Sequence, residues 1–169
     1  EAAFLVAERK LGGVSERIAR YERREEVPFT SERKMMSVVA EHQVRHDTRV
    51  WTKGAPDVLL ERCVAQRVGE ETVPLTDQDR AEINGRIDSL SAGGFRTLAV
   101  AYRLLDQTGP ATDEDLEADL VLVGVVGLID PPRDEARTAV ADARRAGIRV
   151  IMITGDHPRT ARAIAADLG

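Results

Sequence analysis

Four short stretches of the 169-residue chain contain residue types that could bind a phosphorylated ligand, and the first surrounds Phe29. Phe29 is followed by the charged residues Glu32, Arg33 and Lys34. An exposed aromatic ring beside cationic groups can stack on a base and hold phosphates at the same time. The same residues are also compatible with a core phenylalanine beside a solvated strand edge. Alone, this stretch leaves both interpretations open.

A lysine and a glycine stand at the centre of the second stretch, W-T-K-G-A-P-D. Lys53 is expected to end a strand, and Gly54 follows it at once. A lysine at a strand end places an amine over a cleft, and a glycine beside it lets a ligand come close to the backbone. Pro56 suits the first turn of a helix, whose N–H groups would lie at the same edge. An edge-strand lysine beside a turn glycine is the alternative.

The third stretch, G-G-F-R-T-L, places an arginine on a mostly apolar strand. Side chains alternate along a strand, so Arg96 and Leu98 share one face. An arginine in this setting needs an anionic partner. That partner could be a ligand phosphate, or a carboxylate such as that of Glu32.

The fourth stretch, M-I-T-G-D-H-P-R-T, follows an apolar run and precedes a helical pattern. In open parallel sheets, ligands bind beyond the carboxyl ends of the strands. The hydroxyl of Thr154 and the N–H of Gly155 could donate to a phosphoryl oxygen there. Asp156 could bind Mg²⁺, or it could cap the following helix. His157 is expected to be an exposed turn residue rather than a catalytic base.

The elements that must position these stretches fall into two patterns. Hairpins and separate helices up to about residue 129 predict an α+β domain, and the helix–strand–helix pattern after 134 predicts an α/β unit. Two prolines between them, within 130–133, exclude helix and mark a hinge. Helices are predicted over 1–11, 55–63, 76–94 and after 134, a possible helix over 15–24, a loop or short hairpin over 64–75, and strands over 35–42, 48–53, 95–103, 120–130 and 148–153.

Composition excludes several classes of protein. The net charge of −5 argues against general nucleic-acid binding, and no apolar run approaches the about 20 residues of a membrane span. The single cysteine, Cys63, excludes an internal disulfide framework, and we expect it to be a buried helix residue in a protein of a reducing compartment. The chain begins without methionine inside a predicted helix, so we expect it to be part of a longer protein.

Taken together and in order, the motifs resemble those of P-type cation-transporting ATPases, in their calcium-pump-like branch. They are P-F-T-S-E-R-K-M-M, K-G-A-P-D, F-R-T-L-A-V-A-Y-R, G-L-I-D-P-P-R and V-I-M-I-T-G-D, and they span essentially the whole chain. The resemblance implies a nucleotide-binding (N) domain over 1–129, an antiparallel sheet with flanking helices that is incomplete at its N-terminus. It also implies a hinge over 130–133 and a fragment of a haloacid-dehalogenase-like phosphorylation (P) domain over 134–169.

The resemblance implies roles for the candidate residues as well. In the family, the aromatic ring stacks on adenine, the lysines lie beside the nucleotide and the arginine reaches the phosphates. The residues implied to bind ATP or ADP are Glu1, Phe29, Lys34, Lys53, Gly54, Ala55, Arg96 and Leu98, and those implied to face the transferred phosphoryl group are Thr154, Gly155 and Asp156.

A parent protein of this kind would be a membrane pump that uses ATP and Mg²⁺ to move cations through an aspartyl-phosphate. Its remaining P, actuator and membrane domains would be the partners of this portion, which would lie at the cytoplasmic face of the membrane. Two family motifs are not in this sequence: D-K-T-G-T, which holds the nucleophile, and T-G-D-G-x-N-D. Ser31 stands where some members have an arginine. We therefore expect this chain to bind nucleotide and to be catalytically inactive alone.

Two other functions remain compatible with the residues. One is a haloacid-dehalogenase-like phosphatase, with Asp156 or Asp130 as nucleophile, although neither aspartate lies in a D-x-D-x-T pattern. The other is a regulatory or interaction module with an inactive nucleotide pocket.

Overall fold

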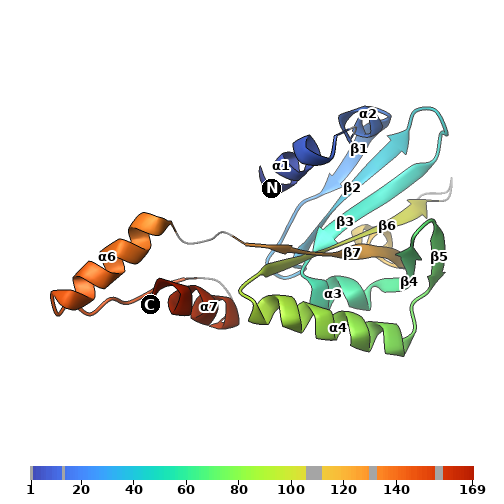
Figure 1. Ribbon diagram of the computed structural model, residues 1–169. Coiled ribbons are helices and arrows are strands. Elements are labelled where there is room, and N and C mark those ends of the chain that lie inside the picture. The colour runs from blue at the N-terminus through green and yellow to red at the C-terminus, as the bar shows by residue number, and fades with distance from the viewer. Residues whose placement is uncertain (1, 13, 106–111, 130–132, 155–157) are drawn as a thin grey trace. The chain divides into compact units, whose positions relative to one another are not determined.

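The structure, a computed structural model, describes residues 2–12, 14–105, 112–129, 133–154 and 158–169 (Figure 1). The chain divides into two compact units. The first contains Glu1–Arg80 and Leu98–Val126, and the second contains Ala81–Thr97 and Gly127–Gly169. Most of the candidate ligand-binding residues belong to the first unit.

A seven-stranded sheet of order β1-β2-β3-β6-β7-β4-β5 forms the framework. Its β1–β2, β2–β3, β3–β6 and β4–β5 pairs are antiparallel, and its β4–β7 pair is parallel. With its flanking helices the chain has a mixed α+β fold, which confirms the predicted class for this part. The strands are β1 (Tyr21–Val27), β2 (Met35–His42), β3 (Thr48–Gly54), β4 (Cys63–Val68), β5 (Glu71–Pro74), β6 (Arg96–Leu105) and β7 (Leu120–Leu128).

The helices begin and end largely where the sequence predicted. In α4 the hydroxyl of Thr76 accepts a hydrogen bond from the N–H of Asp79 at 3.2 Å, and the Asp79 carboxylate accepts from the N–H of Thr76 at 2.9 Å. This reciprocal pair satisfies donors that a helix start leaves unpaired. The helices are α1 (Ala2–Leu11), α2 (Val14–Ile18), α3 (Pro56–Glu61), α4 (Asp77–Ala92), α5 (Asp113–Leu116), α6 (Asp134–Arg145) and α7 (Pro158–Leu168).

A small aliphatic core lies against one face of β1, β2 and β3, called here the core face. Val27, Val39 and Val50 supply one residue from each strand, Leu116 of α5 is buried with them, and Leu105 packs against the cluster. Alternation along each strand sends the neighbouring side chains to the opposite face, called here the cavity face. The core face also carries the buried hydroxyl groups of Ser37 and Thr52, which lie opposite each other in the β2–β3 pair.

Three details of the sequence prediction are wrong. The stretch 15–24 is helical only as far as Ile18, and β1 follows it, formed by charged residues that show no apolar alternation. Cys63 is buried as predicted, but it begins β4 and does not belong to a helix. Residues 148–153 form no strand, and Ile153 is 94% exposed, because no described strand lies beside them to pair with their backbone groups.

The second unit contains α6, α7 and the junction around Phe95. Arg137 of α6 and Asp167 of α7 form an ion pair with an N–O distance of 2.8 Å. A Cβ atom on Gly127 would lie 3.0 Å from the Phe95 ring, so the glycine lets that ring pack against the β7 backbone. Within the described residues, no helix is long and apolar enough to cross a membrane.

Candidate functional site

A cavity of about 720 Å³ opens on the cavity face around Lys53, and it is called here the Lys53 cavity. Its floor is apolar and comes from three neighbouring strands, while Arg23 and Glu26 of β1, themselves an ion pair, stand at one side. The lining residues are Phe4, Arg23, Glu26, Met36, Val38, Trp51, Thr52, Lys53 and Val100.

Strand register explains why these residues meet. Met36 lies opposite Lys53 in the β2–β3 pair, and Val38 lies opposite Trp51. In the β3–β6 pair Lys53 lies opposite Val100. Directly opposed residues of an antiparallel pair point to the same face, so the lysine stands among apolar neighbours from both sides. Lys53 thus lines the cavity beside these apolar residues.

The structure explains why residue 54 is a glycine, and the explanation differs from the one inferred from the sequence. A Cβ atom at Gly54 would lie 2.6 Å from the Cβ atom of Met35 and 2.8 Å from the carbonyl oxygen of Lys34. The N–H of Ala55 donates to that same oxygen at 2.9 Å. The backbone of residues 34–35 therefore occupies the space beside Gly54 on that side. This close approach brings the predicted residues Lys34, Gly54 and Ala55 together.

Phe29 lies on the turn between β1 and β2 and is 61% exposed. The turn is ordered by its own backbone, because the N–H of Lys34 donates to the carbonyl oxygen of Thr30 at 2.8 Å. Lys34 itself has a positive φ of 53°, which is unusual for a residue other than glycine. An exposed ring on a turn of fixed shape excludes the interpretation of Phe29 as a core residue. Among the described residues, Phe29 is not one of those that line the Lys53 cavity.

An ion pair between Arg33, which lies in the Phe29 turn, and Glu117 helps to fix the conformation of this turn. The Arg33 guanidinium donates to the carbonyl oxygens of Pro28 and Met35 and reaches Glu117 at 3.4 Å. Glu117 is buried, with its side chain 1% exposed, and it also accepts from the hydroxyl of Ser37 at 2.8 Å. The turn is therefore fixed at both ends through one arginine.

Sequence reasoning missed this arrangement. Arg33 was interpreted as a possible phosphate contact or as part of a solvated strand edge, and its partner Glu117 lies 84 residues further along the chain. The Ser37 hydroxyl is also 2.9 Å from that of Thr52, which lines the Lys53 cavity. A chain of polar contacts thus joins Thr52, buried on the core face of β3, to the Phe29 turn.

The remaining predicted residues are placed only in part. Leu98 of β6 is half-buried, and Arg96 is exposed at the first residue of the same strand. Thr154 is exposed in the stretch before α7. Within the described residues, no group of three histidine, cysteine or carboxylate side chains could hold a metal ion. Glu1, Gly155 and Asp156 lie outside the described residues, as do Asp130 and His157.

Fold and site together define the class of protein. It is an α+β domain whose sheet carries an apolar cavity lined by a lysine. A family model described as P-type ATPase, cytoplasmic domain N, matches residues 1–135. The chain belongs to this family, which confirms the resemblance seen in its motifs.

Individual relatives agree with the family. The chain is 43% identical over 99% of its length to a calcium-transporting ATPase of Bacillus subtilis, of which it covers 19%. It is 42% identical over 85% of its length to a sodium/potassium exporting P-type ATPase of Schizosaccharomyces pombe, covering 14% of it. It is 39% identical over 83% of its length to human plasma membrane calcium-transporting ATPase 4, covering 12% of it. The chain thus spans less than a fifth of the length of these relatives.

Proposed function

We propose that this chain is the ATP-binding cytoplasmic portion of a cation pump, and that it binds ATP or ADP in the Lys53 cavity. The observation that supports the proposal best is the register that sets Lys53 opposite Met36 and Val100, on the face of the sheet that Val38 shares. Apolar side chains suit the faces of a purine, and an ammonium group beside them suits its phosphates. A volume of about 720 Å³ is of the size that small-ligand sites have.

The Phe29 turn would supply the second half of the base contact. Its exposed ring could stack on adenine, and the Arg33–Glu117 pair would keep the turn in one conformation before nucleotide arrives. A turn that is already ordered has little entropy left to lose on binding. In this proposal Lys34, Gly54, Ala55 and Leu98 complete the wall of the site.

The parts of the reaction beyond binding are also proposals. Residues 1–129 would be the N domain, 130–133 the hinge and 134–169 a haloacid-dehalogenase-like fragment of the P domain. Glu1 would lie beside adenine and Arg96 near the phosphates, while Thr154, Gly155 and Asp156 would face the transferred phosphoryl group. The nucleophilic aspartate would come from a D-K-T-G-T motif elsewhere in the parent, at the cytoplasmic face of its membrane.

In such a pump the work of this portion is positioning. It would hold the nucleotide while the hinge carries the γ-phosphate to the nucleophile, with Mg²⁺ offsetting phosphate charge. Asp156 is the candidate carboxylate for that ion by sequence, and it lies outside the described residues. Alone, the chain should bind nucleotide weakly and release no phosphate.

A nucleotide titration followed by NMR tests the proposal. ATP at about 1–5 mM should shift the amide resonances of Lys53 and Phe29, and Lys53→Ala or Phe29→Ala should weaken the response. Lys10→Ala is a matched control, because Lys10 is an exposed lysine at the end of α1. No shift in the wild-type chain, or equal weakening by the control, would overturn the proposed binding.

Two outcomes would favour the alternative functions. Turnover of p-nitrophenyl phosphate with Mg²⁺ that is lost in Asp156→Asn would indicate a phosphatase. A folded chain that shows no nucleotide response would indicate a regulatory or interaction module.

A further inference from the structure

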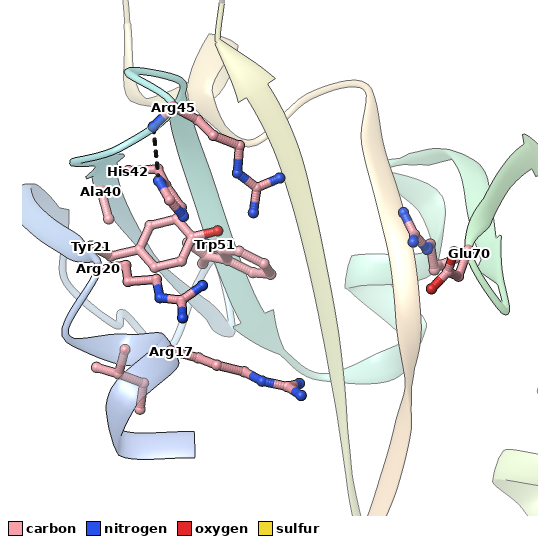
Figure 2. Close-up of a pocket in the computed structure, with 10 residues that line it drawn as sticks. Arg17, Arg20, Tyr21, Ala40, His42, Arg45, Trp51 and Glu70 are labelled. Carbon is pink, nitrogen blue, oxygen red and sulfur yellow. Dashed lines mark hydrogen bonds between the residues drawn. The ribbon is translucent and has the colours of Figure 1, made fainter. Parts of the chain in front are cut away.

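A second cavity, of about 780 Å³, opens at the other end of the cavity face and is called here the arginine pocket (Figure 2). It is bounded by α2 and the start of β1, by the β2–β3 turn, and by the turn of the β4–β5 hairpin. Trp51 is its one residue in common with the described lining of the Lys53 cavity. The lining residues are Arg17, Ile18, Arg20, Tyr21, Ala40, His42, Arg45, Trp51, Arg67 and Glu70.

The charge of this pocket is unusual for so acidic a chain. Four arginines line it against one carboxylate, that of Glu70, although the whole chain carries a net charge of −5. Among the described residues, no carboxylate forms an ion pair with Arg17, Arg20 or Arg45. Arg45 has only the longer-range attraction of Asp47, and Arg17 and Arg20 have no ion-pair partner among the described residues, so the excess of guanidinium groups around one concavity favours an anionic ligand.

Other arginines of the same unit do have carboxylate partners. Arg24 forms an ion pair with Glu41 at 2.7 Å, and Arg49 forms one with Asp47 at 2.6 Å. The hydrogen bond from Arg49 also holds the pKa of Asp47 below its ordinary value. Arg45 of the pocket also contributes to this lowering by longer-range attraction, whereas Arg17 and Arg20 have no carboxylate partner among the described residues.

The wall of the pocket is aromatic. The Tyr21 ring lies edge-on to His42 at 4.8 Å between centroids and to Trp51 at 6.1 Å, and Tyr102 lies 5.4 Å from Trp51. The cluster thus contains both tyrosines and the single tryptophan of a chain with few aromatic residues. In Figure 2, Arg45 lies on one side of the Tyr21 and Trp51 rings, and Arg17 and Arg20 lie on the other.

A neighbouring group reports the same electropositive setting. The hydrogen bond with Thr72, together with the nearby Arg67 and Arg49, lowers the pKa of Tyr102 below its ordinary value. Guanidinium groups also bind phosphates in a bidentate manner, and they stack on aromatic rings. Cations beside an aromatic wall suit a ligand that has both a ring and a phosphate.

We propose that the arginine pocket is a second ligand site, which binds a small phosphorylated aromatic compound. The phosphate would lie between Arg17, Arg20 and Arg45, and the ring would lie against Tyr21 and Trp51. A walled cavity of this volume suits a small molecule better than a flat protein surface. The site is separate from the proposed nucleotide site, and its existence does not depend on that proposal.

Titration of the whole chain with 1-naphthyl phosphate tests the proposal. The side-chain Nε–H resonances of Arg20 and Arg45 should shift together with the Trp51 indole. Arg20→Ala and Arg45→Ala should each raise the Kd about 10-fold, since a charge-assisted hydrogen bond has that effect. Arg144→Ala, which removes an exposed arginine of α6, is the matched control and should leave the Kd unchanged.

Two further arms distinguish binding in the arginine pocket from binding in the Lys53 cavity and from unspecific charge attraction. Lys53→Ala should leave naphthyl phosphate binding unchanged, whatever it does to ATP; if it abolishes that binding, the ligand lies in the Lys53 cavity and the proposal is wrong. Inorganic phosphate and 1-naphthol should each bind at least 10-fold more weakly than the joined compound. Equal binding of inorganic phosphate, or equal loss with Arg144→Ala, would show unspecific attraction and would also overturn the proposal.

Discussion

The ion pair of the partly exposed Arg33 and the buried Glu117 gives the sharpest test of how this domain presents its ligand site. Glu117→Ala removes a carboxylate that is 1% exposed, and with it the contacts to Arg33 and to the hydroxyl of Ser37. Breaking a fully buried pair costs about 3–5 kcal/mol. Arg33 is 24% exposed and keeps its bonds to the carbonyl oxygens of Pro28 and Met35, so the loss should be smaller. We expect about 2–3 kcal/mol of lost stability.

We expect Glu117→Ala also to weaken nucleotide binding, because it removes a contact that holds the Phe29 turn. Base–aromatic stacking contributes about 1–3 kcal/mol, so a turn that no longer holds its ring in place should raise the Kd for ATP about 5-fold or more. Urea unfolding followed by Trp51 fluorescence measures stability within the same unit, and NMR titration measures the Kd well below the unfolding transition. A loss of stability without any change in Kd would refute the role assigned to the turn.

Controls make the result specific to the pair. Glu114→Ala removes an exposed acid from α5, which ends just before Glu117, and should change neither quantity. The double variant Arg33→Ala/Glu117→Ala should be less destabilised than the sum of the two single variants, because residues in contact do not act independently. Additive effects, or a Glu117→Ala loss below about 1 kcal/mol, would show that the pair is not coupled as its burial suggests.

Three other changes have definite expected outcomes. Gly54→Ala should lower the urea midpoint markedly, since its Cβ atom would lie 2.6 Å from that of Met35; an unchanged midpoint would contradict the close packing. Cys63, whose pKa burial raises to about 11, should have about 100-fold less thiolate at pH 8 than an ordinary thiol, so iodoacetamide should label it, by mass spectrometry, rapidly only after unfolding in urea. Thr76→Ala should cost about 1 kcal/mol in urea unfolding by removing the α4 cap. The Thr76 hydrogen bonds also lower the pKa of Asp79, so their contribution is present above the unfolded value near 3.9 and should disappear as pH falls below it; Asp79→Asn should flatten that pH dependence.

The elements with strong local patterns could be predicted from the sequence. The hairpin of β2 and β3, helix α4 and helix α6 were all expected and are present. Strand β1 was not expected, because its residues Glu22–Glu26 are charged and exposed throughout. It forms by pairing with β2, whose buried residues fix the register. An edge strand of this kind is indicated by the pattern of the strand that it pairs with, and not by its own residues.

The apolar run at 148–153 is the opposite case, because a strand was predicted there and none formed. Its composition predicts a strand, yet backbone groups need partners, and among the described residues no strand pairs with it. Period and propensity describe what a segment can form. Whether it forms a strand depends on an element beside it.

The candidate site shows the same division between local and distant information. Lys53 and Gly54 could be found by type and spacing, but the reason for the glycine is the backbone at 34–35, which only the strand register reveals. Glu117 could not be found, because a buried glutamate within an acidic stretch has no local mark. Its partner Arg33 is distant in the sequence, and the burial of Glu117 is a property of the packed domain.

Net charge was the least informative quantity for this molecule. A value of −5 describes the average surface, and it correctly excludes a generally basic one. It hides a sheet face that carries Lys53 at one end and three arginines without described ion-pair partners at the other. Pairing between Tyr21 and His42 in β1 and β2 gathers Arg17 and Arg20 beside Arg45 from positions up to 28 residues apart. Electrostatic recognition acts over about 8 Å at physiological salt. The local cluster of arginines, and not the net charge of the chain, therefore determines which anions such a domain attracts.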